Sequence, residues 1–151
     1  MEITDLQAGK AGEYLVCADL ISLGYIAYPS EQGLQYDVVC DVGGRLLRIQ
    51  VKSTRTKQPV PQRVNRTQSY LFHVRRFGKM GRKSYTNKDL DIVALVALDK
   101  KLVAYIPIQE TKQTMFFRDK EQKISGASRS TKFIQDFPFE RALNLFSDFQ
   151  P

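Results

Sequence analysis

A carboxylate, an amide and an ammonium group gather around one stretch of this sequence that is typical of a β-hairpin. The stretch is YDVVCDVGGRLLRIQVKS, residues 36–53, and the groups belong to Asp37, Gln50 and Lys52. Clustering such groups costs free energy unless they bind one another or a ligand. Carboxylate and amide oxygens are ligands that Mg²⁺ prefers, and an ammonium group stabilises nearby negative charge. These residue types therefore suit a metal site beside an anionic substrate.

Two adjacent glycines, Gly43 and Gly44, predict the register of this hairpin. Both can adopt the positive φ that a two-residue hairpin loop requires. Asp37 then faces Gln50, with Cβ atoms about 5 Å apart, and Lys52 lies on the same face. A slip of one residue would move Asp37 into the apolar face, which pairs Tyr36 with Val51, Val38 with Ile49 and Cys40 with Leu47. An ordinary salt bridge between Asp37 and Lys52 on a solvated sheet face is the alternative.

Positive charge is concentrated in one part of the chain. The net charge is +7, and residues 42–88 contain 13 of the 23 Lys and Arg residues but no Asp or Glu. The other 104 of the 151 residues carry the remaining 10 basic residues and all 16 acidic ones. An uncompensated basic stretch repels itself, so this distribution favours a nucleic acid partner over a basic face that is merely solvated.

The sequence also bears on the compartment of the protein. No apolar run is long enough to span a membrane, and the polar N-terminus does not have the pattern of a signal peptide. Cys17 and Cys40 both lie in apolar patterns, which favours buried free thiols over a disulfide bond. We therefore expect a cytoplasmic protein.

The order of helix and strand signals predicts one domain over residues 1–151. A helix is expected from Thr4 to Leu23, because Gly24 is a stop signal. The expected strands are residues 25–28, the hairpin 36–53, and residues 70–74, 91–98 and 102–108, with a short helix at residues 137–149. Basic loops are expected at about 54–69 and 75–88, and residues 109–132 give no clear pattern. This order favours an α/β or α+β fold, with a mixed central β-sheet flanked by helices.

Three motifs in order resemble the core of the PD-(D/E)xK nuclease superfamily, to which Holliday junction resolvases and many restriction enzymes belong. Glu13 lies in the helical segment GKAGEYLVCADLISLGY, Asp37 follows 24 residues later, and the triplet QVK, residues 50–52, begins 13 residues after Asp37. The family usually has an acidic residue where this chain has Gln50, and a proline where it has Tyr36. The QxK form resembles the branch of cyanobacterial group I intron homing endonucleases. The resemblance implies a restriction-endonuclease-like α/β core and Mg²⁺-dependent cleavage of double-stranded DNA, with Mn²⁺ as a substitute ion.

The resemblance also implies roles for the site residues. Asp37 would be the principal metal ligand, joined by the side-chain oxygen of Gln50 and the carbonyl oxygen of Val51. Lys52 would orient the attacking water or stabilise negative charge, and Glu13 would bind a second metal ion. For Glu13 the alternative is an ordinary exposed glutamate on a helix. A neutral Gln50 offsets less metal charge than a carboxylate, which leaves open a DNA-binding protein with a degenerate, non-catalytic nuclease core.

Basic residues of the two expected loops are the candidate DNA contacts, most of them to phosphates. Those near the strand of Lys52 are Arg55, Lys57, Arg63 and Arg66, and the second set is Arg75, Arg76, Lys79, Arg82, Lys83, Tyr85 and Lys88. For His73, the single histidine, a structural or DNA-facing role is favoured over catalysis.

Cleavage of both DNA strands requires two active sites, which predicts a symmetric homo-oligomer, a dimer at least. The resemblance implies a tetramer. A Holliday junction resolvase or a restriction-type nuclease is the alternative within the same enzyme class.

Overall fold

The computed structural model describes residues 1–60, 68–74, 76–78, 81–83, 86–122 and 130–146. For residues 76–78 and 81–83, only the backbone is described. Most of the expected DNA-binding residues, or their side chains, therefore lie outside the description. These are Arg63, Arg66, Arg75, Arg76, Lys79, Arg82, Lys83 and Tyr85.

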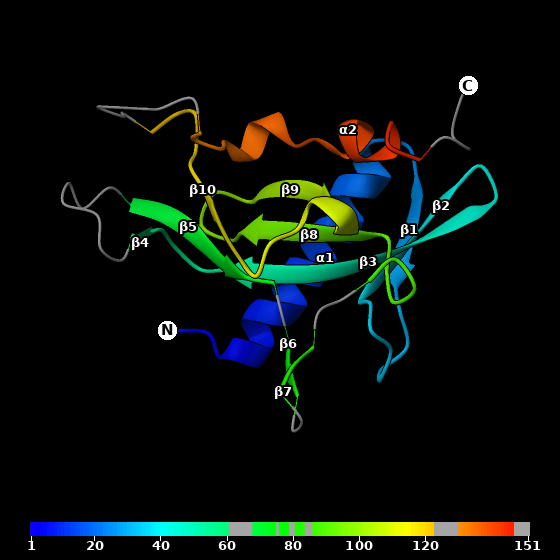
Figure 1. The fold of residues 1–151 in the computed structure, drawn as a ribbon, viewed down its shortest axis with the longest axis horizontal. Helices are drawn as coiled ribbons and strands as arrows, with labels where there is room; N and C mark the ends of the chain where they lie inside the picture. The colour runs from blue at the N-terminus through cyan, green and yellow to red at the C-terminus, as the bar shows by residue number, and fades with distance from the viewer. Residues whose placement is uncertain (61–67, 75, 79–80, 84–85, 123–129, 147–151) are drawn as a thin grey trace.

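A mixed five-stranded sheet forms the centre of the fold, as the sequence predicted (Figure 1). Its order is β1-β2-β3-β8-β9, with β3 and β8 parallel and the other neighbours antiparallel. The strands are β1 (Ile26–Pro29), β2 (Val38–Val42), β3 (Arg45–Thr54), β8 (Ile92–Ala97) and β9 (Leu102–Pro107). A second sheet has the order β10-β5-β4, from β4 (Gln58–Pro59), β5 (Gln68–His73) and β10 (Thr114–Phe117).

The helix α1 (Asp5–Ser22) begins and ends where its capping signals predict. The Thr4 side chain accepts a hydrogen bond from the amide of Gln7, and the Gln7 side chain accepts one from the amide of Thr4. This capping box satisfies two donors that would otherwise lack a partner. Gly24 follows the helix with a φ of 95°, a conformation that glycine adopts without strain.

Each face of the central sheet is covered by a different layer. On one face, α1 and the short helix α2 (Phe139–Leu143) bury a cluster that includes Val16, Leu20, Ile49 and Phe139. On the other face, residues of β5 and β10 pack with Val93, Leu95 and Ile106 in a second cluster. Figure 1 shows α1 crossing behind β3, β8 and β9. Strand β3 therefore has a helix on one side and a second sheet on the other.

The hairpin register is the one that the glycine pair predicts. Val38 pairs with Ile49 and Cys40 with Leu47, and Gly43 and Gly44 form the turn with positive φ. Tyr36 was expected beside Val38 on the apolar face, and this is wrong, because it packs with the second cluster instead. The reason is that the ladder of β2 ends at Val38, and the chain bends before it reaches Tyr36.

The two basic segments contain strands where loops were predicted. Gln58–Pro59 forms β4 at the edge of the second sheet, a position where proline costs no ladder hydrogen bond. The other basic segment contains a hairpin of β6 (Arg76–Gly78) and β7 (Gly81–Lys83), which protrudes from the body of the molecule (Figure 1).

The remaining elements and the cysteines complete the comparison with the sequence. Within the unassigned segment lie β10 and the 3₁₀ helix η1 (Ile108–Glu110), and a second 3₁₀ helix, η2 (Ile134–Asp136), precedes α2. Both cysteines are buried free thiols, as expected. None of the helices in the described part of the chain has the length and apolar character needed to cross a membrane.

Candidate active site

Asp37, Gln50 and Val51 form one hydrogen-bonded cluster at the start of β2. The Oδ2 atom of Asp37 accepts hydrogen bonds from the side-chain amide of Gln50 and from the backbone amide of Val51, both at 2.8 Å. The predicted convergence of Asp37 with Gln50 is therefore present. The amide nitrogen of Gln50 faces Asp37, and this hydrogen bond fixes the orientation of the amide group. A metal ligand would use the amide oxygen instead.

The bend at Asp37, immediately before β2, explains why this carboxylate lies here. The backbone amide of Asp37 donates to the carbonyl of Ile49 at 2.9 Å, and its carbonyl accepts from Ser30 instead of from β3. The amide of Val51 therefore needs another acceptor, since a buried amide without one costs free energy. The Asp37 carboxylate supplies it. The side chain of Asp37 is fixed to the backbone of the strand that carries Gln50 and Lys52.

Burial raises the pKa of Asp37 above its ordinary value, because the surrounding protein replaces water around the carboxylate. The hydrogen bond from Val51 opposes this rise in pKa, and the negative charge of Glu13 adds to it. The positive charges of Lys52 and Lys10 lower the pKa in turn. The four charged side chains therefore act on one another, and the net effect of burial and these partners is a raised pKa of Asp37.

Glu13 reaches this cluster from α1, and it has a partner that the sequence did not suggest. Its Oε2 atom lies 2.8 Å from the Nζ atom of Lys10, three residues earlier on the helix. Only 18% of the Glu13 side chain is exposed, against 47% for Lys10. Glu13 is therefore not the freely exposed helix residue that was its alternative interpretation. The three-residue spacing of Lys10 and Glu13 is the sequence signal that could have predicted the pair.

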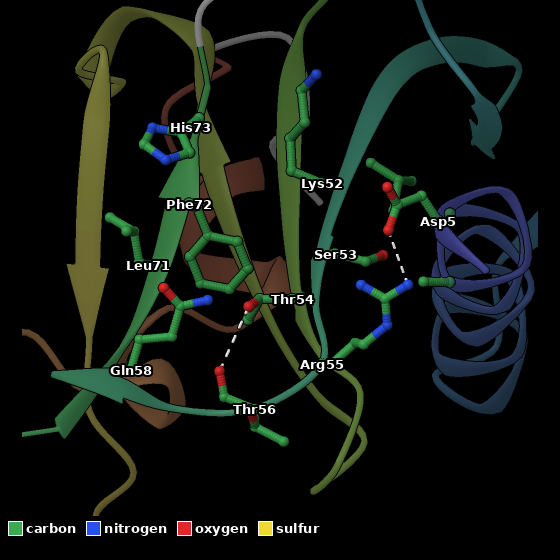
Figure 2. Close-up of a pocket in the computed structure, with 13 residues that line it drawn as sticks. Asp5, Lys52, Ser53, Thr54, Arg55, Thr56, Gln58, Leu71, Phe72 and His73 are labelled. Atoms are coloured by element: carbon green, nitrogen blue, oxygen red, sulfur yellow. Dashed lines mark hydrogen bonds and ion pairs between the residues drawn. The ribbon is translucent and has the colours of Figure 1, made fainter. Parts of the chain in front are cut away.

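A cleft of about 550 Å³ adjoins the cluster at Val51 and Lys52. Its walls come from the first turns of α1, from β3 and its continuation over residues 51–56, and from residues 71–73 of β5. In Figure 2, Lys52 and His73 lie toward one end of this cleft, with Thr56 and Gln58 toward the other. Asp37, Gln50 and Glu13 are not part of its walls. The charged cluster thus lies beside an open cleft that Lys52 joins to it.

Comparison with known proteins places the chain in a nuclease family. A family model for PD-(D/E)XK endonucleases matches residues 3–140. The chain belongs to the PD-(D/E)XK endonuclease family. The solved structure of a bacterial homing endonuclease, I-Ssp6803I, matches this fold with a TM-score of 0.69 at 18% sequence identity, over 95% of this chain and 94% of that one. No match was found among curated protein sequences.

PD-(D/E)XK nucleases generally use divalent metal ions, and the donor set of this chain suits one. In the described part of the chain, no group of three or more His, Cys, Asp and Glu side chains lies close enough together to hold an ion. The available donors are the carboxylates of Asp37 and Glu13 and the amide of Gln50, all of which offer oxygen to a hard cation. The Oδ1 atom of Asp37 takes part in neither of the two hydrogen bonds above, so it is the candidate ligand atom. The residues of this PD-(D/E)XK site therefore fit a hard divalent cation that is held by few protein ligands.

Of the three expected DNA contacts whose side chains the structure describes, Arg55 and Lys57 are already engaged within the protein. The guanidinium of Arg55 binds the carboxylate of Asp5 at 2.8 Å and the carbonyl of Ile3 at 2.9 Å, which ties the start of α1 to the end of β3 (Figure 2). The ammonium of Lys57 lies 5.9 Å from the ring centre of Tyr70, a cation–π distance. Lys88 is exposed beside the start of β8.

Arg48 is the basic residue whose role sequence reasoning missed. Its guanidinium binds the carboxylate of Asp91, at 3.2 Å from Nε to Oδ2, and the carbonyl oxygens of Asn87 and Lys88 at 2.9 and 2.6 Å. The backbone amide of Arg48 also donates to Asp91. Arg48 therefore fixes the end of the basic stretch against β3. The residues it contacts lie 39–43 positions away, so local patterns could not predict this.

Proposed function

We propose that this PD-(D/E)XK protein is a Mg²⁺-dependent, sequence-specific DNA endonuclease that makes double-strand breaks, as an intron homing endonuclease does. The observation that carries the proposal is the cluster of Asp37, Gln50 and Lys52, with Glu13 beside it, at the edge of the cleft. The concentration of basic residues supports DNA as the substrate. The fold shared with a bacterial homing endonuclease supports the homing function.

Each side chain of the cluster has a role in this chemistry. A divalent cation, when bound, polarises the scissile phosphate and lowers the pKa of a water molecule. Asp37 would hold the cation, while Gln50 and Val51 fix the orientation of Asp37 through Oδ2. Lys52 orients the attacking water or stabilises the negative charge that develops in the transition state. Glu13 is the further carboxylate that could bind a metal ion, and Mn²⁺ would suit the same oxygen donors as Mg²⁺.

One protomer carries one such cluster, whereas cleavage of both strands needs two. We therefore propose that the active form is a homo-oligomer on double-stranded DNA, a dimer at least, with a tetramer as the next symmetric assembly. Closed symmetry matches a target whose two half-sites are related by a two-fold axis.

The test is cleavage of a plasmid library that carries bacterial genomic inserts, in Mg²⁺, followed by sequencing of the new ends. We expect the parent chain to produce paired ends with a constant stagger at one class of sequence. Asp37→Ala should reduce cleavage by more than about a hundredfold, since even residues that only support a metal ligand contribute 10–100-fold. DNA binding by the variant, measured in Ca²⁺, should stay within a few-fold of the parent.

Three outcomes would contradict parts of the proposal. Cleavage by Asp37→Ala at the parental rate would show that the site lies elsewhere. Faster cleavage of a four-way junction than of any linear duplex would favour a Holliday junction resolvase, and cuts at many short sites would favour a restriction-type nuclease.

A second candidate function, DNA binding without catalysis, is favoured by the contact between Gln50 and Asp37. A glutamine amide stabilises the carboxylate in the absence of metal, which a glutamate at that position could not do. If this is the function, the chain binds DNA and leaves it uncut in Mg²⁺ and in Mn²⁺.

A further inference from the structure

Helix α1 packs closely on β3 at Gly12. A Cβ atom built on Gly12 would lie 1.8 Å from Oγ and 3.2 Å from Cβ of Ser53, and 3.4 Å from Cγ1 of Val51. The first of these distances is impossible for real atoms, and the second requires Ser53 to move by a few tenths of an ångström. Gly12 is itself buried. A side chain at this position would therefore require Oγ of Ser53 to turn away and Ser53 to shift from the helix.

The other glycine of α1, Gly9, does not lie in a close contact of this kind. A Cβ atom on Gly9 would meet nothing within 4 Å. Glycine in a helix interior is unfavourable relative to alanine, because it loses more conformational freedom on folding. At Gly12 this cost is offset by the close packing of α1 on β3. At Gly9, no such packing offsets the cost.

The contact at Gly12 lies next to the functional groups on both elements. Val51 and Ser53, which Gly12 touches, are the two neighbours of Lys52 on β3. Glu13 follows Gly12 directly on the helix. The Oγ atom of Ser53 is buried and has no hydrogen-bond partner. Because this hydroxyl forms no hydrogen bond, the packing of α1 on β3 at this point depends on the size of the side chains.

A second contact fixes α1 further along the same strand. Arg55 of β3's continuation binds Asp5 and the carbonyl of Ile3 at the start of the helix. Those bonds hold the helix end, which is largely exposed: 97% of the Asp5 side chain is accessible. The distance between helix and strand near Glu13 and Lys52 is therefore determined at Gly12 and not at Arg55.

We infer that Gly12 is a positioning residue of the active site: its missing side chain sets the distance between the helix of Glu13 and the strand segment of Lys52. This inference rests on the proposed nuclease function. A methyl group at Gly12 would push α1 away from Val51 and Ser53, and it would move Glu13 from Asp37 and Lys52. A displacement of about 1 Å can cost about a hundredfold in rate when a site depends on geometry.

The experiment measures single-turnover cleavage at saturating DNA and Mg²⁺, together with DNA affinity in Ca²⁺ and the Tm of each variant. Gly12→Ala should slow cleavage at least tenfold, while its DNA affinity stays within about threefold of the parent. Its Tm should fall. The same exchange at Gly9 meets nothing within 4 Å and should raise the Tm through helix propensity. Because Gly9 lines the cleft, its variant is a control for the Tm alone, and the double variants described next are the control for the rate.

Enlarging the space on β3 should rescue the variant. Gly12→Ala with Ser53→Ala removes the contact at 1.8 Å and leaves the one at 3.2 Å, and Gly12→Ala with Ser53→Gly removes both. We expect the rate to recover partly in the first double variant and further in the second. Ser53→Gly alone should slow cleavage less than Gly12→Ala does, because it leaves the helix in place.

The outcomes separate this inference from the proposed function. Cleavage by the parent but not by Asp37→Ala would support the function, and cleavage by Gly12→Ala at the parental rate would then overturn the positioning role alone. A loss of rate that matches the unfolded fraction of Gly12→Ala, or no recovery in the second double variant although it is folded, would overturn it as well. A parent chain that cuts no DNA would overturn the function and the inference together.

Discussion

Asp37 is a carboxylate that the fold retains at a cost. Its pKa is raised by burial, yet its Oδ2 atom is the acceptor that the amide of Val51 requires. A neutral side chain with an oxygen in the same place would satisfy the amide and avoid the buried charge. A carboxylate that binds a cation would explain this residue type. A substitution that removes the charge of Asp37 should therefore raise the stability of the protein and reduce its activity.

Asp37→Asn should stabilise the metal-free protein at neutral pH while it abolishes cleavage. Because the pKa of Asp37 is raised in the folded protein, its ionised form lowers the free energy of unfolding above that pKa. This loss of stability disappears below pH 3.8, the ordinary pKa of the group, where Asp37 is protonated in the folded and the unfolded protein. The gain in Tm should therefore be present at neutral pH and disappear in acid. Thermal unfolding in EDTA across this range provides the measurement, and a gain that persists in acid would contradict the explanation.

Gln50→Glu should make the fold depend on a divalent cation. It would place a second carboxylate in contact with Asp37, where Gln50 now donates a hydrogen bond at 2.8 Å. Two like charges about 4 Å apart repel by up to about 4 kcal/mol near a protein surface. We expect the Tm in EDTA to fall by several degrees and to recover as Mg²⁺ or Ca²⁺ is added, since a bound ligand stabilises the folded state.

The control for this variant is the combination of Gln50→Glu with Asp37→Asn. One of the two charges is then absent, so the Tm in EDTA should return most of the way without metal. Equal losses in the single and the double variant would mean that the introduced carboxylate destabilises the fold for a reason other than its repulsion from Asp37.

The elements of the central sheet are connected by the parallel pairing of β3 with β8. Ile49 pairs with Ile92 and Lys52 with Leu95, so the strand that carries the site is supported by a fully buried neighbour. Arg48 and Asp91 lie at the start of this pairing, and Arg48 also holds the carbonyl of Lys88. The ion pair is partly buried, with 14% of the Asp91 side chain exposed.

Asp91→Ala should lower the free energy of unfolding by about 2–3 kcal/mol. It would leave the Nε atom and the backbone amide of Arg48 without their acceptor, and a buried group that loses its partner costs about 1–3 kcal/mol. Urea denaturation is the measurement. Asp5→Ala is the matched control, because that carboxylate also binds an arginine but is 97% exposed, and its loss should cost less than about 1 kcal/mol. Equal effects of the two substitutions would contradict the structural role of Asp91.

At the scale of the whole molecule, electrostatic charge is divided between two parts of the sequence. The stretch from Val42 to Lys88 carries 13 basic residues and no acidic ones, although the protein as a whole has a net charge of only +7. Affinity for DNA should therefore be high at low salt and should fall steeply as salt releases the phosphate contacts. Arg55 and Arg48 contribute less to this than their charges suggest, because internal carboxylates and carbonyls already bind them.

Lys88→Gln should reduce the slope of log Kd against log salt concentration by about one, the change expected for one lost phosphate contact. Lys88 is exposed, and Arg48 fixes its backbone beside β3. Lys120→Gln is the control, because Lys120 lies outside the basic stretch and forms an ion pair with Asp136. Fluorescence anisotropy over a salt series measures both. A slope unchanged by Lys88→Gln would remove this residue from the DNA interface.

Local signals in the sequence determined the central hairpin, the first helix and the order of the site residues. Gly43 and Gly44 fix the turn, the alternation of apolar residues fixes which way Gln50 and Lys52 point, and Thr4 with Gln7 fixes the start of α1. These signals act over a few residues, so they can be interpreted without tertiary contacts. Glu13 and Asp37 could be selected only with the help of the family pattern.

The tertiary structure decided what lies around those residues. It turned Tyr36 to the other face, directed the amide nitrogen of Gln50 to Asp37, and paired Arg48 with a carboxylate 43 positions away. It also placed α1 so close to β3 that a Cβ atom on Gly12 would clash with the hydroxyl of Ser53. Each of these features depends on how α1, β8 and the second sheet pack against β3, and long-range packing leaves no periodic signal in the segments that it brings together.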